Sequence, residues 1–350
     1  MKRPTGSDVA RLAKASKSTV SRVFNGGVVS FEARSRILEA AEQLNYRPHP
    51  IARSLTTNKS NLIGIAVTYL DNQFYPEVIQ KLSDRFAALG YRIVLFLTHG
   101  EKTLDPMLNE ILSYSLDGIV FASSSLSADV AVGCRNANIP TVMFNSVDPL
   151  GRVKGLAASN KAGAEMIAEF LIAGEHRFFA VISGMDDSST SVERCKAFSD
   201  KIVSAGFTPP QIECGYYSFD GAAKATRKLL SGSKEIDAIF CANDHMALAA
   251  LQTARQEFGR EIGKDLSIVG FDNVQIAGWP AFGLTTYAQP IDNMINRIIT
   301  YLVDSIEGRP GNDTPEFVEG ELIVRESARR PDGVKRSTRG DHVWSPASRP

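Results

Sequence analysis

Apolar residues recur at helical spacing in three short segments near the start of the chain. The apolar positions are Val9, Leu12 and Ala13 in the first segment, Val20, Val23 and Phe24 in the second, and Ile37, Leu38, Ala41 and Leu44 in the third. Each set lies on one side of an α-helix, so the three helices are expected to bury these sides against one another. The pattern predicts a small three-helix core at the start of the chain.

Short polar residues mark where these helices begin and end. Thr5 followed by Asp8 resembles a capping box, and Ser16 and Ser30 can cap the second and third helices. The Asn-Gly-Gly stretch at 25–27 supplies a stop for the second helix. The first two helices are therefore expected to be short and joined by a tight turn.

The side of the second helix that faces away from the predicted core is polar. Lys17, Ser18, Ser21 and Arg22 fall there, and such side chains suit base edges and phosphates. Two short helices with this outer face are typical of a helix-turn-helix DNA reader. On this pattern alone, the alternative that both helices merely belong to a helical core stays open.

The segment after the third helix reads as a linker. Its Tyr-Arg-Pro-His-Pro stretch at 46–50 breaks the helix, and Pro50 fits the first position of a two-turn helix that follows. Isolated helices shorter than about 12 residues are marginal in water. We expect residues 49–60 to become helical only where another surface supports them.

From Leu62 onward, short apolar runs alternate with helical stretches. The runs are LIGIAV, YRIVLFLT, DGIVFAS, PTVMFN, FFAVISG, DAIFCAND and LSIVGFD. This alternation predicts parallel sheets with helices on both faces, and so many units exceed one sheet. The expected fold is α/β, with two doubly wound lobes divided near Ser159. Ligands are expected at the carboxyl ends of the strands and in the cleft between the lobes.

The segment 331–350 differs from both regions. It has four basic residues, several Pro and Gly, and no apolar periodicity. The sequence therefore predicts a disordered tail.

Composition places the chain among globular proteins with an ample core. It has 350 residues, of which 43% are hydrophobic and 22% charged, and two or three domains are expected. No apolar stretch has the length of a signal peptide or a membrane span, so we expect a cytoplasmic protein. The four cysteines lie far apart without Cys/His clusters, which indicates no disulfide framework, metal site or cofactor.

Charge is distributed unevenly along the chain. Residues 1–60 contain 11 Lys and Arg against 4 Asp and Glu, whereas the whole chain has 39 of each kind. A neutral protein with one basic end is expected when only that end meets a polyanion. This asymmetry favours DNA reading over the helical-core alternative.

Other function classes fit the sequence less well. The chain contains no GxGxxG, P-loop, GxSxG or HExxH motif, so no enzyme is indicated. A periplasmic sugar-binding protein would share the two lobes but not the basic helical segment. A core that answers to a partner protein is an alternative that the sequence leaves open.

Several stretches together resemble the LacI/GalR family of bacterial transcriptional regulators. They are DVARLAKASKSTVSRVFN, YRPHPIARSL, LIGIAV, NQFYPEVI, CANDHMALAAL, VGFDN, LTTYAQP and LIVRES, in order and at family-like spacing. The resemblance implies a DNA-binding headpiece at 1–48, a hinge helix at 49–60, and a core at 61–330 that dimerises and senses a small molecule. It places about 61–158 and 289–317 in the first lobe, and about 159–288 and 318–330 in the second.

The resemblance also assigns candidate DNA contacts. Lys17 and Ser18 match positions that vary with operator sequence, and Arg22 matches a base-contacting arginine. Thr19, Ser21 and Asn25 match residues that position the protein on the DNA backbone. Leu55 matches a leucine that wedges into the minor groove, with a small core contact as its alternative.

The chain departs from the family pattern at two positions. Lys14 stands where a turn glycine is common, so a positive φ there introduces strain of about 1 kcal/mol. His49 stands where an asparagine usually caps the hinge helix, which makes this hinge more dependent on DNA for folding.

The cleft is expected to hold a polar ligand. The resemblance places Phe74, Tyr75, Arg194, Asn243 and Asp272 there. A cation, an amide and a carboxylate beside aromatics suit a sugar or sugar derivative. Arg194 can bind an anion bidentately, which suggests an acid or phosphate, yet it serves neutral sugars in related pockets too. Packing explains the weaker candidates equally well, and helix capping explains Asp244; the weaker candidates are Asn145, Tyr217, Trp279 and Gln289.

Overall fold

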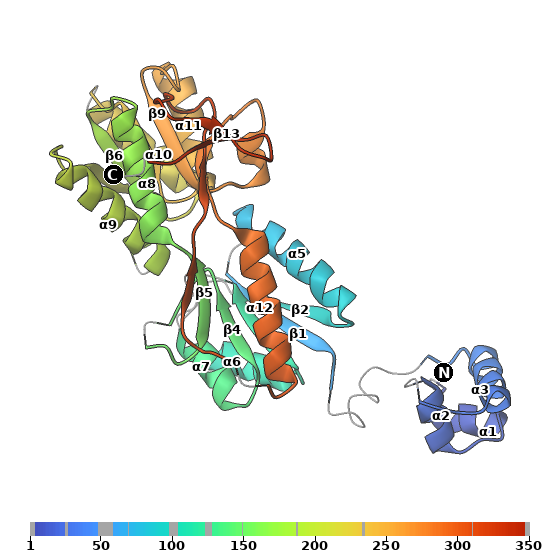
Figure 1. Cartoon of the computed structure of the whole chain (residues 1–350). Helices are drawn as coiled ribbons and strands as arrows, with labels where there is room; N and C mark the ends of the chain where they lie inside the picture. The colour runs from blue at the N-terminus through green and yellow to red at the C-terminus, as the bar shows by residue number, and fades with distance from the viewer. Residues whose placement is uncertain are drawn as a thin grey trace. The chain divides into compact units, whose positions relative to one another are not determined.

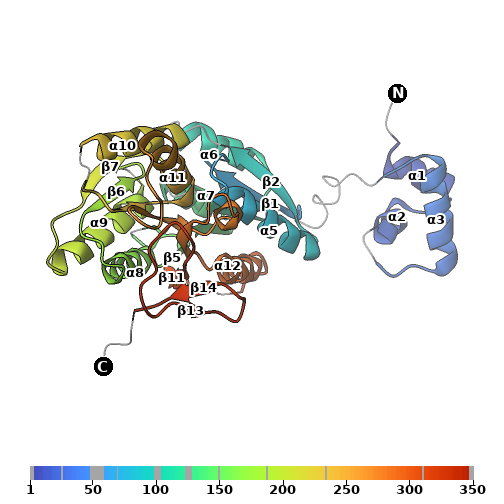
Figure 2. The same ribbon diagram turned by 90° about the horizontal axis from the view of Figure 1, so that it is seen from above.

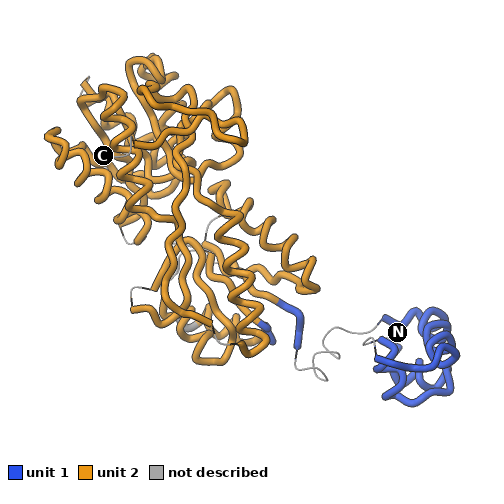
Figure 3. Tube along the Cα trace, viewed as in Figure 1, with its two compact units in different colours: residues 1–62, 115–117 blue, residues 63–114, 118–350 orange. Residues whose placement is uncertain are grey.

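The chain divides into two compact units, which are described separately (Figure 3). The computed structural model describes residues 4–24, 27–47, 59–68, 70–97, 104–122, 128–148, 150–186, 188–232, 235–309 and 311–346. One unit comprises residues 1–62 with 115–117, and the other comprises 63–114 with 118–350.

Three helices form the core of the N-terminal unit. They are α1 (Gly6–Leu12), α2 (Lys17–Phe24) and α3 (Phe31–Gln43). Their buried residues include Val9, Val20, Val23 and Ile37, and a Phe24–Tyr46 edge contact with ring centroids 5.6 Å apart closes one end. The prediction that Leu12 and Leu38 lie in the core is wrong. Each is 47% exposed, because Ala10 and Ala40 occupy the inner face instead.

The predicted helix caps are present. Thr5 donates its backbone N–H to Asp8 at 3.0 Å, Ser16 accepts from the N–H of Thr19 at 3.0 Å, and Ser30 accepts from Ala33 at 3.3 Å. These bonds satisfy N–H groups that the first turn of a helix leaves unpaired. The sequence therefore sets the starts of all three helices locally.

Lys14 adopts the left-handed conformation that its turn requires. Its φ is 49°, and the N–H of Ala15 bonds to the carbonyl of Ala10 at 2.9 Å, as in a Schellman motif. The positive φ that the prediction required is therefore confirmed, and the strain of about 1 kcal/mol stays a prediction.

In the second unit, the described strands form two sheets. The first is six-stranded, in the order β11-β5-β4-β3-β1-β2. Its strands are β1 (Leu62–Val67), β2 (Arg92–Leu97), β3 (Gly118–Ala122), β4 (Thr141–Phe144), β5 (Lys154–Ala158) and β11 (Glu316–Val318). Strand β1 pairs with β3, β3 with β4, β4 with β5 and β5 with β11, all in parallel.

The other sheet is eight-stranded, in the order β13-β14-β12-β10-β9-β8-β6-β7, counted over the described residues. Its strands are β6 (Phe179–Ser183), β7 (Gln211–Cys214), β8 (Ala238–Cys241), β9 (Ser267–Asp272), β10 (Thr285–Ala288), β12 (Glu321–Ile323), β13 (Lys335–Arg336) and β14 (His342–Trp344). Strands β6 to β10 are parallel, whereas β12, β13 and β14 pair antiparallel.

Helices cover both faces of each sheet (Figures 1 and 2). In the first lobe, α5 (Phe74–Ala88) lies beside α12 (Ile291–Ile306), while α6 (Leu104–Ser113) contacts α7 (Ala128–Asn136). In the second, α8 (Asn160–Ala173) contacts α9 (Ser189–Ser204), and α10 (Phe219–Gly232) contacts α11 (Asp244–Phe258). A 3₁₀ turn spans Gln275–Gly278. The predicted doubly wound α/β architecture is confirmed.

The chain passes between the sheets at the ends of β5, β10 and β11. Helix α12 and β11 thus belong to the first lobe, although they follow β10 of the second. The carboxyl ends of strands from both lobes are consequently close to the segments that connect the lobes.

The prediction of a disordered tail is wrong for residues 331–346. Strand β14 extends the second sheet, pairing Trp344 with Leu322 and Val343 with Ile323. The Trp344 ring is 7% exposed, meets Phe170 at 5.6 Å, and donates its indole N–H to the carbonyl of Asp332 at 3.1 Å. Strand β14 has three residues and is anchored by a single ring, so the segment is too short for apolar periodicity to show in its sequence.

Within the described residues, no helix is long and apolar enough to cross a membrane, and no group of His, Cys, Asp and Glu could hold a metal ion. The four cysteines are free thiols.

Candidate functional site

Helix α2 presents a polar surface on the N-terminal unit. Lys17, Ser18, Ser21 and Arg22 are exposed, while Val20 and Val23 on the opposite side are buried. Thr19 is half-buried, because its N–H and hydroxyl both engage Ser16. The cap thus fixes the first turn of α2 and leaves the longer side chains on its outer face.

Two of the predicted DNA contacts lie outside the described residues. They are Asn25, which follows α2, and Leu55 in the linker; His49 also falls there. Their roles stay predictions.

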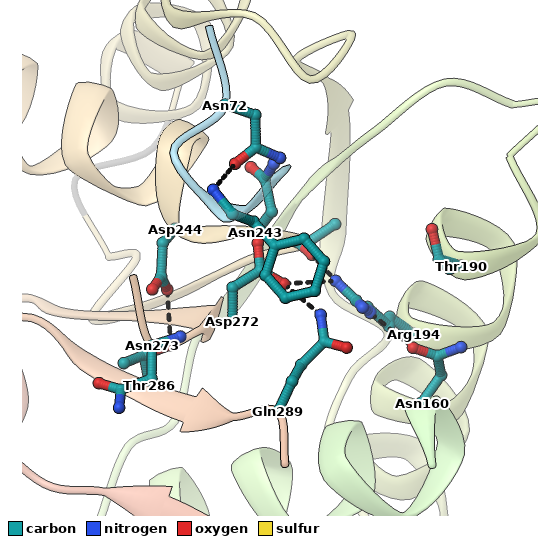
Figure 4. A network of polar contacts seen from close by, with 12 residues as sticks. Asn72, Asn160, Thr190, Arg194, Asn243, Asp244, Asp272, Asn273, Thr286 and Gln289 are labelled. Carbon is teal, nitrogen blue, oxygen red and sulfur yellow. Dashed lines mark hydrogen bonds and ion pairs between the residues drawn. The ribbon is translucent and has the colours of Figure 1, made fainter. Parts of the chain in front are cut away.

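A buried polar cluster lies where strands of the second lobe end (Figure 4). Asp272 is the last residue of β9, Asn243 follows β8, and Gln289 follows β10. Arg194 reaches the cluster from α9, and all four side chains are at most 5% exposed. Parallel strands bring these positions together because their carboxyl ends meet at one edge of the sheet.

Arg194 is held on several sides. Its Nε donates to the Oδ1 atom of Asn160 at 2.8 Å, and its Nη1 donates to the carbonyl of Ala242 at 2.8 Å. Nη1 is also 3.6 Å from Asp272 Oδ1, and the guanidinium lies 3.6 Å from the centroid of the Phe271 ring. The cation is therefore fixed in place before any ligand arrives.

Asp272 is strained and electrostatically unusual. Its φ is 133°, and its carboxylate accepts a hydrogen bond from Gln289 Nε2 at 2.6 Å. Burial raises the pKa of Asp272 to about 7, although Arg194 acts in the opposite direction. A non-glycine residue in this backbone region is uncommon and clusters at functional sites.

Asn243 caps α11, with Oδ1 accepting from the N–H of Met246 at 3.0 Å. The predicted capping role of Asp244 is therefore wrong. Asp244 instead accepts from the Thr286 hydroxyl at 2.5 Å and from the Val274 N–H at 2.9 Å, in a fully buried position. Burial raises the pKa of Asp244 to about 6. Asp244 thus ties the start of α11 to β10 and to the loop after β9.

Phe74 and Tyr75 lie in the first lobe, at the start of α5. Both are buried, and the Phe74 ring packs against Tyr75 at 5.3 Å and against Phe144 at 6.2 Å between centroids. These contacts place both rings in the core of their own lobe.

The loop between β1 and α5 approaches the second lobe. Burial lowers the pKa of His245 near the start of α11, and Asp71 of this loop acts on it in the opposite direction. Asp71 of the first lobe therefore lies close enough to His245 of the second lobe to influence its charge.

Among the weaker candidates, the structure separates two groups. Asn145 and Gln289 are 5% exposed, and the Oδ1 of Asn145 and the Oε1 of Gln289 have no hydrogen-bond partner among the described residues. Tyr217 is bonded to Thr190 at 3.0 Å, and Trp279 is 53% exposed. The unpaired buried atoms therefore favour Asn145 and Gln289 as ligand contacts, whereas nothing comparable favours Tyr217 or Trp279.

Arg194 Nη2 and Asn243 Nδ2 are also buried without a hydrogen-bond partner among the described residues. Burying a polar atom without a hydrogen bond costs about 1–3 kcal/mol, and native proteins contain few such atoms. Three of them, on Arg194, Asn243 and Gln289, lie in the buried cluster and indicate a site that a polar ligand completes, while Asn145 follows β4 in the first lobe.

Asn160 is a cluster residue that our sequence analysis missed. It opens α8 two residues after the end of β5, is 3% exposed, and bonds both Arg194 and Glu193. A polar residue shortly after a buried strand is the signal that could have identified it.

Comparisons with known proteins agree with both parts of the structure. The family model "Bacterial regulatory proteins, lacI family" matches residues 6–49, and the model "Periplasmic binding protein-like domain" matches residues 168–328. The ribose operon repressor of Halalkalibacterium halodurans is 32% identical over 328 residues, covering 92% of this chain and 96% of that protein.

Solved structures give the same result. The complex of the transcriptional regulator CelR with cellobiose aligns at a TM-score of 0.70 and 26% identity, covering 93% of this chain and 100% of that one. The Lac repressor dimer bound to operator and the anti-inducer ONPF aligns at 0.83 and 23% identity, covering 94% of this chain and 100% of that one. The second likeness shows the shared fold.

A helix-turn-helix unit joined to a two-lobed binding-protein-like core defines a DNA-binding transcriptional regulator. The chain belongs to the LacI family of bacterial regulatory proteins, as its match to a repressor over nearly the whole length shows. The predictions that the chain is a transcriptional regulator and not an enzyme are confirmed by the family match and by this relative, a repressor.

Proposed function

We propose that this repressor binds a pseudo-palindromic operator as a dimer and responds to a sugar or sugar derivative held at the Arg194–Asp272 cluster. The observation that carries the proposal is the set of buried polar atoms without partners at this cluster, on a family scaffold that binds DNA at its other end. The proposal places its action in the cytoplasm, where bacterial DNA is accessible.

The DNA end is proposed to act through α2. Arg22 and Lys17 are exposed cations, and Ser18 and Ser21 are exposed beside them. In the proposal, Lys17, Ser18 and Arg22 reach base edges, while Thr19, Ser21 and Asn25 position the unit on phosphates. Leu55 is proposed to enter the minor groove at the operator centre.

The ligand is proposed to be rich in hydroxyl groups. The cluster atoms without partners include donors, on Arg194 and Asn243, and an acceptor, on Gln289. A hydroxyl group both donates and accepts, so several hydroxyls can satisfy this mixture. The CelR structure that resembles this chain holds cellobiose, a ligand of this kind.

A second copy of the chain is proposed to cover the β2 edge of the first lobe. Strand β2 ends its sheet, and Leu95 and Leu97 on it are 39% and 50% exposed. Tyr114 and Leu112 add further exposed apolar surface, and Tyr114 packs against Phe96 of β2. An open edge strand with apolar side chains is a surface that proteins normally cover.

Binding selection from random duplex DNA by the full-length chain tests the proposal. We expect enrichment of a sequence with two-fold symmetry, since a dimer reads two related half-sites. Sedimentation should give a dimer, and Leu97→Asp should yield a monomer with weaker operator binding. An asymmetric selected site, or a wild-type monomer at micromolar concentration, would contradict the dimer.

A screen of sugars for release or enhancement of operator binding tests the ligand half. A response to a partner protein in a lysate, with none to any sugar, would favour the alternative of protein control.

A further inference from the structure

We infer that the cluster takes a neutral polyhydroxylated ligand, that it disfavours ligands that bring a carboxylate or phosphate to Arg194, and that Asn160 sets this preference. The inference rests on the proposed function, because it assumes that the cluster is the effector site. It narrows the ligand class from sugars and sugar acids to neutral sugars.

The first argument is the occupancy of the guanidinium edges. An arginine binds an anion bidentately through either its Nε/Nη2 edge or its Nη1/Nη2 edge. Here Nε is bonded to Asn160 Oδ1 at 2.8 Å, so one of the two nitrogens of the Nε/Nη2 edge is occupied. Nη1 carries two N–H groups, but it bonds the carbonyl of Ala242 at 2.8 Å and lies 3.6 Å from Asp272 Oδ1, so protein acceptors occupy its part of the second edge. Among the described residues only Nη2 is without a partner, so Arg194 offers one nitrogen and no complete fork.

The second argument is charge. Asp272 Oδ1 lies 3.6 Å from Nη1, and both side chains are 3% exposed. A carboxylate or phosphate on Nη2 would repel Asp272 whenever this carboxyl is ionised, and would otherwise require Asp272 to hold its proton, in a site with little water. A neutral hydroxyl accepts from Nη2 without that repulsion.

The third argument is the polarity of the other unpaired atoms. Gln289 Oε1 needs a donor, and the orientation of this amide is fixed because its Nε2 donates to Asp272. Asn243 Nδ2 needs an acceptor, and its orientation is fixed because Oδ1 caps α11. An ionised carboxylate only accepts hydrogen bonds, whereas a hydroxyl satisfies both atoms.

Asn160 is a positioning residue in this arrangement. Its Nδ2 donates to Glu193 Oε2 at 3.0 Å, which turns Oδ1 toward Arg194 Nε (Figure 4). Removing this amide frees the Nε/Nη2 edge, while Ala242 and the Phe271 ring still hold the guanidinium. Asn160 therefore prevents an anion from binding bidentately to the Nε/Nη2 edge of Arg194.

The test measures binding of matched neutral and anionic probes to the full-length protein. The pairs are cellobiose with cellobionate, glucose with gluconate, and ribose with ribose 5-phosphate, measured by thermal shift and calorimetric titration. We expect at least one neutral sugar to bind about tenfold or more tightly than its anionic partner, the scale of one hydrogen bond to a charged group.

Two variants isolate the role of Asn160. Both Asn160→Ala and Asn160→Asp lose the amide that bonds Glu193, but only Asn160→Asp keeps an acceptor oxygen for Nε. We expect the neutral-to-anionic affinity ratio to fall by about tenfold in Asn160→Ala and not to fall in Asn160→Asp, whose carboxylate keeps an acceptor for Nε and itself repels anions. Equal changes in both variants would refute the positioning role.

The outcomes separate the inference from the proposed function. An acid or phosphate that binds at least as tightly as its neutral partner and alters operator binding overturns the inference but supports the effector site. If no member of any pair binds or alters operator binding, both the inference and the proposed sugar response are overturned.

Discussion

Single residues account for most of the chemistry proposed for this repressor. Lys14 stands where the family commonly has a turn glycine, and this difference should have a measurable effect on stability. Its φ of 49° falls in the region where a side chain with Cβ is strained by roughly 1–2 kcal/mol. The Schellman motif that ends α1 requires this conformation.

Replacing Lys14 with Gly should therefore stabilise the three-helix unit by about 1 kcal/mol. Hydrogen exchange of the α1 to α3 amides in the full-length chain measures the free energy of unfolding. Lys14→Ala retains Cβ and serves as the control, so an equal gain in that variant would show that charge, and not φ, is responsible.

Arg22 is expected to discriminate between DNA sequences. Arg22→Ala should weaken binding to the selected operator by about 1–3 kcal/mol and change non-specific binding much less, because base contacts are lost only at the specific site. Binding curves at one salt concentration on operator and scrambled duplexes measure this. Arg36→Ala on α3 is a matched control, and equal losses on both duplexes for Arg22→Ala would identify a phosphate contact.

Asp272 is expected to make stability depend on pH. Burial raises its pKa in the folded protein from 3.8 to about 7, so the folded state holds a proton that the unfolded chain releases. The stabilisation from this proton is complete below pH 3.8 and is lost as the pH rises through about 7.

Asp272→Asn should remove this dependence. The free energy of unfolding of the variant relative to the wild type should therefore rise by at least about 1.4 kcal/mol across that window, the equivalent of one pKa unit. Denaturation at a series of pH values measures the change. Asp200→Asn, at a side chain that is 64% exposed, is the control, and parallel wild-type and Asp272→Asn curves would be evidence against the pKa shift.

At the scale of elements, one aromatic ring holds the C-terminal hairpin of β13 and β14 on the second sheet. Trp344 anchors β14 through Phe170 and through the carbonyl of Asp332, and β14 lies beside β12, which follows the last passage between lobes. The hairpin is thus part of the second sheet and depends on one side chain.

Trp344→Ala should release the hairpin, because truncating a buried tryptophan costs about 3–5 kcal/mol. We expect the amides of β14 to lose protection from hydrogen exchange while those of β9 and β10 keep it. Trp279→Ala, which truncates a ring that is 53% exposed, is the control. Retained protection in β14 would mean that its backbone pairing alone suffices.

Helix starts, in contrast, followed from sequence. Ser16 and Ser30 cap the helices that their positions predicted, since a cap involves only neighbouring residues. The exposed Leu12 and Leu38 did not follow, because two apolar faces of similar hydrophobicity compete and packing against the other helices selects one.

For the whole molecule, the proposed function requires that ligand and DNA affinities be coupled. Arg194 lies in the cluster and belongs to a different compact unit from α2. A coupling between such distinct sites is reciprocal and is typically worth about 1–3 kcal/mol.

Arg194→Ala should leave operator affinity within about twofold of wild type and abolish the change that a neutral sugar produces, because it removes a proposed ligand contact in a different compact unit from α2. Operator binding with and without the sugar that the panel identifies measures both quantities. Arg177→Ala, at an exposed position of the same lobe, is the control. Loss of operator affinity together with the response would place Arg194 in the fold's stability and not in ligand binding.

The sequence by itself determined the architecture: a helix-turn-helix unit with a basic exposed face, followed by alternating strands and helices in two lobes. These features are set by local periodicity, capping and charge, which a chain carries without its tertiary contacts. It also placed Arg194, Asn243 and Asp272 in one site through resemblance.

Only the tertiary structure decided what those residues can do. Asn160 is 34 residues from Arg194 along the chain, yet it holds Nε and leaves Nη2 as the one unpaired nitrogen of that side chain within the described residues. The assignment of Asn243, not Asp244, as the cap and the ordering of 331–346 were decided in the same way. Burial and hydrogen-bond partners depend on which distant segments meet, and no local pattern specifies that.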